Sequence, residues 1–139
     1  MFNNPADSDM KLILEKSKNI AVVGLSANCE KDSHRVAQYL KEKGYCIIPV
    51  NPSEDEILGQ RCYKELASIP VRVDIVNVFR RSEYLPAVIE EAISINAGCI
   101  WAQLGVKDDS SADKAVNRGV KVVMDRCIKV EHQRLLGEK

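Results

Sequence analysis

Short apolar runs alternate with amphipathic stretches along most of the chain. The runs are four to six residues long and cover 20–23, 45–50, 74–79, 98–103 and 120–124. A strand of a parallel sheet typically has such a continuous apolar run, because helices cover both faces of the sheet and bury both sides of the strand. The pattern therefore predicts five parallel strands.

The stretches between these runs have helical spacing. Val36, Ala37 and Leu40 lie on one face of a helix that Asp32 or Ser33 caps and that Gly44 ends. Ser82 is predicted to cap another helix, in which Leu85 begins the apolar face. Further helices are predicted at 9–17, 108–118 and 128–136, with a short helical turn at 63–67.

The alternation of strand and helix predicts a single α/β domain over 1–139, with its core at about 19–135. Right-handed crossovers between parallel strands then give a Rossmann-like, doubly wound, five-stranded sheet with helices on both faces. Ligands of such folds bind beyond the carboxyl ends of the strands, where the strand order changes direction. The residues just after each strand are therefore the candidates for a site.

Composition narrows the class of partner. Lysine plus arginine equals aspartate plus glutamate, 20 against 20, so no bulk charge favours nucleic acid or an anionic membrane. The five cysteines have no paired spacing, which argues against a zinc site and a disulfide framework. No apolar run approaches the roughly 20 residues of a membrane helix, and the N-terminal residues lack a signal-peptide core. The sequence therefore predicts a cytoplasmic protein with no metal site.

The first strand ends in an incomplete dinucleotide fingerprint. Gly24 holds the first glycine position, but Ser26 and Cys29 stand where G-x-G-x-x-G has its other glycines. Free backbone amides near Ser26, at the start of a helix, would favour a phosphate. Three interpretations remain open from these residues: an altered NAD site, another phosphate site, or a tight turn with no ligand.

The end of the second strand favours an adenosine ligand with an additional ribose phosphate, such as NADP or coenzyme A. An NAD site usually has an acidic residue here, whereas this chain has Asn51 and Pro52. Lys31 and Arg35 are close enough in sequence to bind the additional phosphate, although both also fit a solvated helix face.

The third and fourth strands end in further candidates. Arg80 and Arg81 follow the third strand and are suited to bind phosphate, or to pair with surface carboxylates. Phe79 either packs on an adenine or completes the core. Trp101 is either a core aromatic or a wall of the cleft, and Gly105 would let a ligand approach the backbone.

Cys127 and His132 are the residues most suggestive of an enzyme. A thiol beside a histidine base can act as a nucleophile, but five positions on a helix correspond to about 500° of rotation. The two side chains would then lie on different faces, so a packed thiol is favoured and no catalytic residue is predicted.

Taken in order, several stretches resemble one family. They are "AVVGLSANCEKDSHRVAQYLKEKGY", "IIPVNPSEDEILGQRCYKELASIP", "VDIVNVFRRSEYLPAVIEEAI", "CIWAQLGV" and "GVKVVMDRCIKVEH". The chain is similar to the small stand-alone CoA-binding domain proteins, and to the N-terminal domain of the succinyl-CoA synthetase alpha subunit. The synthetase carries a phosphohistidine in a second domain, and neither His34 nor His132 has a matching context, so its ligase activity is not expected here.

The resemblance implies a coenzyme A site at the strand ends. It implies these cofactor-binding residues: Gly24, Leu25 and Ser26 in the phosphate loop, Lys31 and Arg35 near the phosphates, Asn51 and Pro52 near the adenosine, Phe79 and Arg80 along the cleft, and Trp101, Gln103 and Gly105 on its far side.

The leading hypothesis is a binding module for coenzyme A or an acyl-CoA, without catalysis of its own. The alternatives are an NADP-dependent oxidoreductase, an acyl-CoA transferase or thioesterase that uses Cys127, and a subunit whose cleft has lost its ligand. Leu135, Leu136 and the exposed sheet edge would suit a homodimer or another partner protein, or the two leucines pack on their own core.

Overall fold

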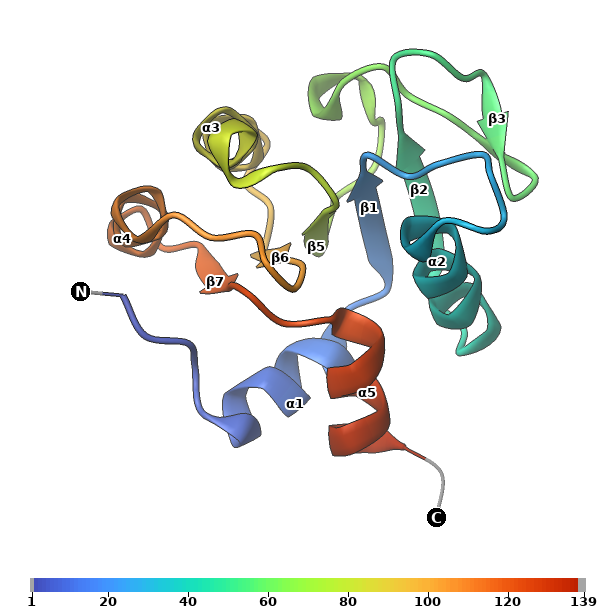
Figure 1. Cartoon of the computed structure of the whole chain (residues 1–139). Coiled ribbons are helices and arrows are strands. Elements are labelled where there is room, and N and C mark those ends of the chain that lie inside the picture. Colours follow the sequence, from blue (N-terminus) through green and yellow to red (C-terminus); the bar gives the residue numbers. More distant parts are fainter. Residues whose placement is uncertain (1, 138–139) are drawn as a thin grey trace.

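Five parallel strands form the central sheet of the computed structural model, which describes residues 2–137. The strands are β1 (Asn19–Val23), β2 (Cys46–Val50), β5 (Ile75–Val78), β6 (Cys99–Ala102) and β7 (Lys121–Val123). Their order across the sheet is β2-β1-β5-β6-β7 (Figure 1). The predicted five-stranded parallel sheet is confirmed, with strand limits that differ by one or two residues.

Helices cover both faces of the sheet, as the doubly wound prediction requires. They are α1 (Asp7–Lys16), α2 (Asp32–Glu42), α3 (Leu85–Ser94), α4 (Asp109–Asn117) and α5 (Ile128–Leu136). Helices α3 and α4 pack on one face, and α1, α2 and α5 pack on the other (Figure 1). The Rossmann-like α/β fold is therefore confirmed.

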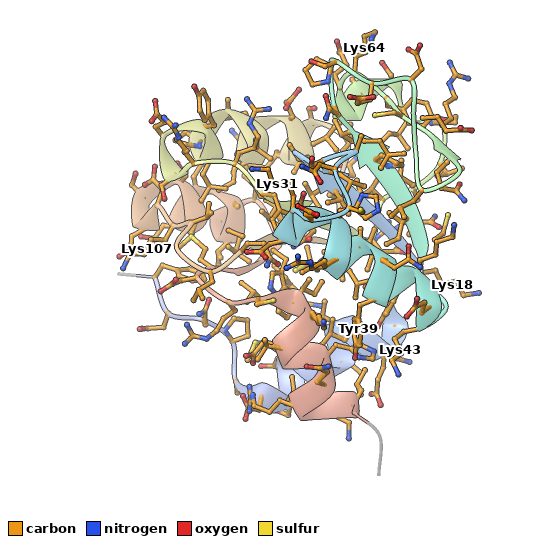
Figure 2. The ribbon with its side chains drawn as sticks, turned by 45° about the vertical axis from the view of Figure 1, so that its right-hand side comes forward. Lys18, Lys31, Tyr39, Lys43, Lys64 and Lys107 are labelled. Carbon is orange, nitrogen blue, oxygen red and sulfur yellow. The ribbon has the colours of Figure 1, made fainter. Side chains whose placement is uncertain are left out.

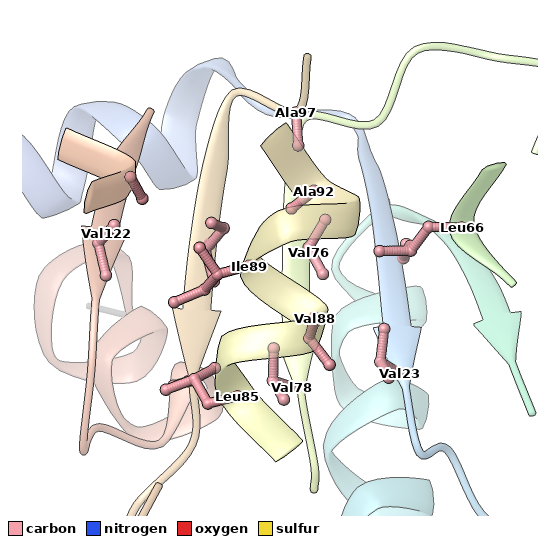
Figure 3. Packing of buried hydrophobic residues seen from close by; sticks show 14 of the residues in the cluster. Val23, Leu66, Val76, Val78, Leu85, Val88, Ile89, Ala92, Ala97 and Val122 are labelled. Carbon is pink, nitrogen blue, oxygen red and sulfur yellow. The ribbon is translucent and has the colours of Figure 1, made fainter. Parts of the chain in front are cut away.

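The alternation of side chains along each strand builds two separate cores. In β5, Val76 and Val78 face α3, where they meet Leu85, Val88 and Ile89 (Figure 3). All five are at most 5% exposed. Burying such a side chain contributes roughly 1.5–3 kcal/mol relative to leaving it in water, so these layers hold the strand ends in fixed positions.

The strand order places a switch point between β1 and β5. The chain goes outward from β1 to β2 and then crosses back to β5 on the other side of β1. Val23, the last residue of β1, is in register with Val50 of β2 and Val78 of β5. The residues that follow these strands therefore meet at one edge of the sheet, called the C-terminal edge below.

The segment after β2 differs from its prediction. Residues 63–67 were expected to form a helical turn, but Tyr63 pairs with Val50 in a parallel bridge. A short hairpin of β3 (Glu56–Ile57) and β4 (Gln60–Arg61) precedes it, and the 3₁₀ turn η1 (Leu66–Ser68) follows. Backbone hydrogen bonds to the end of β2 determine this extended path, which no side-chain pattern indicated.

Ser82 also differs from its predicted role as a helix cap. A 3₁₀ turn, η2 (Ser82–Tyr84), precedes α3, and neither element has a side-chain cap. The Ser82 hydroxyl instead donates to Gly105 O at 3.3 Å and accepts from the Lys107 N–H at 3.0 Å. It therefore links the loop after β5 to the loop after β6.

Candidate functional site

Gly24 makes the turn at the end of β1. Its φ of +87° is in the left-handed region, and a Cβ added there would lie 2.5 Å from Phe79 O. Its N–H donates to Val50 O at 3.0 Å. Only glycine fits this turn without strain, and the turn ties the ends of β1, β2 and β5 together.

Side chains of the loop and of the first turn of α2 hold the loop from Gly24 to Lys31 in place. The Ser26 N–H donates to Ser33 Oγ, and the Asn28 N–H donates to Ser26 Oγ, both at 3.0 Å. The Nδ1 atom of His34 donates to Ser26 O at 2.9 Å. Ser33, predicted as a possible helix cap, therefore fixes the loop, and His34 supports Ser26 from α2.

This loop offers donors to an anion. Within residues 2–137, the N–H groups of Ala27 and Asp32 donate no hydrogen bond, and both residues are exposed. Asp32 is the first residue of α2, where the helix dipole favours negative charge, and Ala27 lies in the loop that leads into this helix. Lys31 is exposed at the start of this helix (Figure 2). Arg35 approaches Asp32 at 3.9 Å in an exposed ion pair, which costs little to break.

Asn51 connects β2 to this loop. Its Nδ2 donates to Leu25 O at 2.9 Å, and its Oδ1 accepts from the Ser53 N–H at 2.8 Å. Beside it, Lys64 Nζ donates to Pro52 O at 3.0 Å. Sequence reasoning missed Lys64, because the predicted helical turn gave no sign that this segment returns to the end of β2. Figure 2 shows Lys64 at the same end of the molecule as Lys31.

A cleft of about 580 Å³ opens beside the loop, between the first turns of α2 and α5. Its lining residues are Asp32, Arg35 and Val36 from α2, Phe79, Gln103, Leu104 and Val106 from the strand ends and loops, and Cys127, Lys129 and Val130 at the start of α5. Apolar side chains alternate with two cations and one carboxylate, so the cleft suits a ligand with both apolar and anionic parts.

Gln103 places a fixed donor in this cleft. It is 6% exposed, and its Oε1 accepts from Asn77 Nδ2 at 2.9 Å and from the Ile128 N–H at 3.1 Å. Its Nε2 has no partner among the residues that the structure describes. Because both bonds hold the oxygen toward the protein, the amide nitrogen is presented to the cleft. The buried Oδ1 of Asn77 also has no hydrogen-bond partner within residues 2–137.

The remaining predicted residues at the strand ends divide between the cleft and its rim. Phe79 lines the cleft and packs partly on the α2 side of the core. The Arg80 guanidinium lies 4.8 Å from the centre of the Tyr84 ring. The Gly105 N–H donates to Asp125 Oδ1 at 2.7 Å, so the loops after β6 and β7 are joined.

Trp101 is not brought to the cleft. Its side chain is 0% exposed, packs in the core on the α1, α2 and α5 side, and donates from Nε1 to Arg126 O at 3.0 Å. The expectation that it lines the far side of the cleft is therefore not met. The segment that leads into α5 covers this position, and its Arg126 O accepts the hydrogen bond from the indole.

Cys127 and His132 are separated by their surroundings. Cys127 is the N-cap residue of α5, is partly exposed and lines the cleft. His132 is buried, and its Nδ1 forms a 2.7 Å hydrogen bond with the Tyr39 hydroxyl of α2. This ring nitrogen is therefore engaged between the two helices, and the geometry does not support a thiol–imidazole pair.

Residues 2–137 show neither a metal-binding cluster nor a membrane-spanning helix. They contain no group of three or more His, Cys, Asp or Glu side chains placed to hold a metal ion. None of their helices has the length and apolar character needed to cross a membrane.

The chain also matches a known protein family. Residues 18–133 match the family described as the CoA binding domain. The chain belongs to this CoA-binding domain family. The resemblance seen in the sequence is therefore confirmed.

Relatives of two sizes share this domain. The uncharacterized protein YneT of Bacillus subtilis is 46% identical over 131 residues, which cover 94% of this chain and 97% of YneT. Acetate–CoA ligase [ADP-forming] II of Archaeoglobus fulgidus is 33% identical over 92 residues, or 65% of this chain. The chain matches only 12% of that ligase's length. The ligase's activity thus belongs to a much longer protein.

A solved structure shows the same fold as a small protein. A hypothetical protein from Pyrococcus horikoshii superimposes with a TM-score of 0.92 at 35% identity, covering 99% of each chain. The same fold therefore also occurs at this size in a solved structure.

Proposed function

We propose that this protein binds coenzyme A or an acyl-CoA at the C-terminal edge of its sheet, without catalysis of its own. One observation carries the proposal: the loop with free amides at Ala27 and Asp32 opens directly into a cleft that contains the unpartnered amide of Gln103. An anion-binding loop joined to a partly apolar cleft matches a diphosphate joined to a pantetheine arm. The family membership supports the same ligand.

The diphosphate is assigned to the loop after β1. Exposed amides at the N-terminus of α2 would donate to phosphate oxygens, and Lys31 would add a positive charge. Arg35 lines the cleft and would have to leave Asp32 to join them. Gly24 matters because it keeps the loop close to Phe79.

The pantetheine arm is assigned to the cleft. Its methylene and methyl groups would pack on Phe79 and Val106, and one of its amide carbonyls would accept from Gln103 Nε2. Gln103 cannot turn without losing the hydrogen bonds to Asn77 and Ile128, so the donor is preorganised.

The adenosine is assigned to the end of β2. Asn51 and Pro52 provide a neutral surface there, and Lys64 beside Pro52 would bind the 3′-phosphate. A carboxylate at this position would repel that phosphate, whereas an amide does not.

The absence of turnover is part of the proposal. His132, the histidine closest in sequence to Cys127, is bonded to Tyr39 rather than to the thiol. A Cys127→Ser variant that loses an acyl-transfer or thioesterase activity shown by the wild type would contradict this part.

Calorimetric titration of ligand-free protein with coenzyme A, dephospho-coenzyme A and NADP tests the proposal. Coenzyme A should bind saturably, dephospho-coenzyme A more weakly, and NADP not at all. Binding of NADP alone would favour the oxidoreductase, and binding of none of the three would contradict a nucleotide site.

A further inference from the structure

We propose that Cys127 forms a reversible mixed disulfide with the thiol of coenzyme A when the cofactor is presented as coenzyme A disulfide. The inference rests on the proposed function. It adds a modification site and a redox response to the binding cleft.

The cleft leads from the phosphate loop to this cysteine. Asp32 and Arg35 line it beside the loop, and Cys127 and Val130 line it at the first turn of α5. The sulfur of coenzyme A is at the opposite end of the molecule from the adenosine. With the diphosphate at the start of α2, the arm would extend along the cleft and carry its sulfur toward α5.

Gln103 independently indicates a ligand beside this thiol. Its Oε1 is bonded to the N–H of Ile128, the residue next to Cys127, and its Nε2 has no partner in the described part of the chain. The side chain is 94% buried and its oxygen is held by two hydrogen bonds, so the direction of the amide nitrogen is fixed, and this donor is open to a ligand carbonyl in the cleft. A carbonyl of the pantetheine arm at this amide would place the adjoining sulfur close to Cys127.

The other cysteines are placed differently. Cys62 and Cys99 are buried, and burial raises the pKa of each thiol, that of Cys99 to about 12. Cys29 and Cys46 are exposed, but neither lines the cleft. Cys46 begins β2 at the opposite edge of the sheet. Cys127 is therefore the cysteine that a bound coenzyme A would meet.

The reaction is a thiol–disulfide exchange. Cys127 loses its proton, and its sulfur attacks one sulfur of coenzyme A disulfide. The disulfide bond of the reagent breaks, a bond forms between Cys127 and one coenzyme A, and the second coenzyme A leaves as a thiolate that takes up a proton. One disulfide replaces another, so no separate oxidant is required. Leu104 lines the cleft and is 72% exposed, so the cleft is open to solvent on this side, where the second molecule would depart.

The test is intact-protein mass spectrometry after incubation of the full chain with coenzyme A disulfide, followed by peptide mapping. Binding raises the local concentration of the reacting sulfur to the order of millimolar, so at micromolar reagent Cys127 should react at least about tenfold faster than Cys46. Cys127→Ser should lose the adduct, and Cys46→Ser should keep it. Added dithiothreitol should release it, and excess reduced coenzyme A should slow its formation.

Titration of the wild type with reduced coenzyme A separates the two proposals. Saturable binding of reduced coenzyme A together with the adduct at Cys127 is the expected result. Saturable binding with no adduct at Cys127, or with equal labelling of Cys29, Cys46 and Cys127, overturns this inference and leaves the proposed function standing. Failure of reduced coenzyme A to bind the wild type overturns both.

Discussion

Gly24 and Phe79 approach so closely that a single added carbon would lie 2.5 Å from the Phe79 carbonyl oxygen. Gly24 also has a φ of +87°, which disfavours every other residue. This contact holds the loop after β1 against the end of β5. The shape of the candidate site therefore depends on the absence of a side chain at Gly24.

Gly24→Ala should destabilise the protein by more than the roughly 1–3 kcal/mol that a left-handed backbone costs, because contact with Phe79 adds to it. Gly44→Ala is a matched control, since its φ is +99° and nothing lies within 4 Å of an added Cβ. Urea unfolding of both variants measures the difference. Equal losses would show that the contact with Phe79 contributes nothing.

Much of this fold could be predicted from the sequence, because continuous apolar runs and helical spacing are local patterns. Helix α5 (Ile128–Leu136) was predicted with its observed limits, and each predicted strand corresponds to an observed one. The hairpin at 56–61 could not be predicted in this way. Its two strands pair with each other, and backbone bonds of Tyr63 to the end of β2 anchor the segment that follows. Such backbone bonds leave no residue pattern.

The site could be predicted only in outline. The positions after the strands identified Gly24, Asn51 and Phe79, because parallel strands end at one edge. The burial of each side chain could not be predicted from these positions. Trp101 and Gln103 are two positions apart and so lie on the same face of the strand and the loop after it, yet Trp101 is fully buried and Gln103 lines the cleft.

Arg80→Ala should weaken coenzyme A binding by roughly 1.5–3 kcal/mol, or about tenfold to hundredfold, if Arg80 makes a charged hydrogen bond to the ligand. Arg80 packs near Gly24 and over Tyr84, at the switch point of the sheet. Isothermal titration calorimetry measures the change. Arg81→Ala, at an exposed neighbouring position, should bind within about twofold of the wild type. Unchanged affinity of the Arg80 variant would exclude this role.

Lys64→Ala should selectively reduce the preference for the 3′-phosphate. Its ammonium is exposed, so the loss should be near 1 kcal/mol, or about fivefold, for coenzyme A. Dephospho-coenzyme A should bind the variant and the wild type equally. Lys18→Ala removes a lysine at the other edge of the sheet and should change neither affinity (Figure 2). A loss of the same size for both ligands would place the 3′-phosphate elsewhere.

The Asp74 carboxylate should make the free energy of unfolding depend on pH in the acidic range. Its partial burial alone would raise the carboxyl pKa, but N–H bonds from Asn19 and Lys18, with Arg72, hold the pKa below its ordinary 3.8. A lowered pKa contributes stability that is fully present above about 3.8 and is lost as the pH falls through the folded-state value.

Urea unfolding of Asp74→Asn from neutral pH to about pH 3 tests this. The variant should be less stable than the wild type at neutral pH. The difference between their free energies of unfolding, called the gap below, should become smaller as the pH falls. Glu83→Gln, on an exposed turn, should follow the wild-type curve. A gap that stays constant with pH would show that the Asp74 charge does not contribute.

The most direct test of the central claim is an NMR titration of ¹⁵N-labelled protein with coenzyme A, read at each backbone amide. The amides of 25–33, 103–106 and 127–130 should shift together and saturate at one equivalent. Those of Lys18, Gly44 and Gly98, which precede strands at the other edge, should stay in place. Shifts confined to that other edge, or none at all, would contradict a coenzyme A site in this cleft.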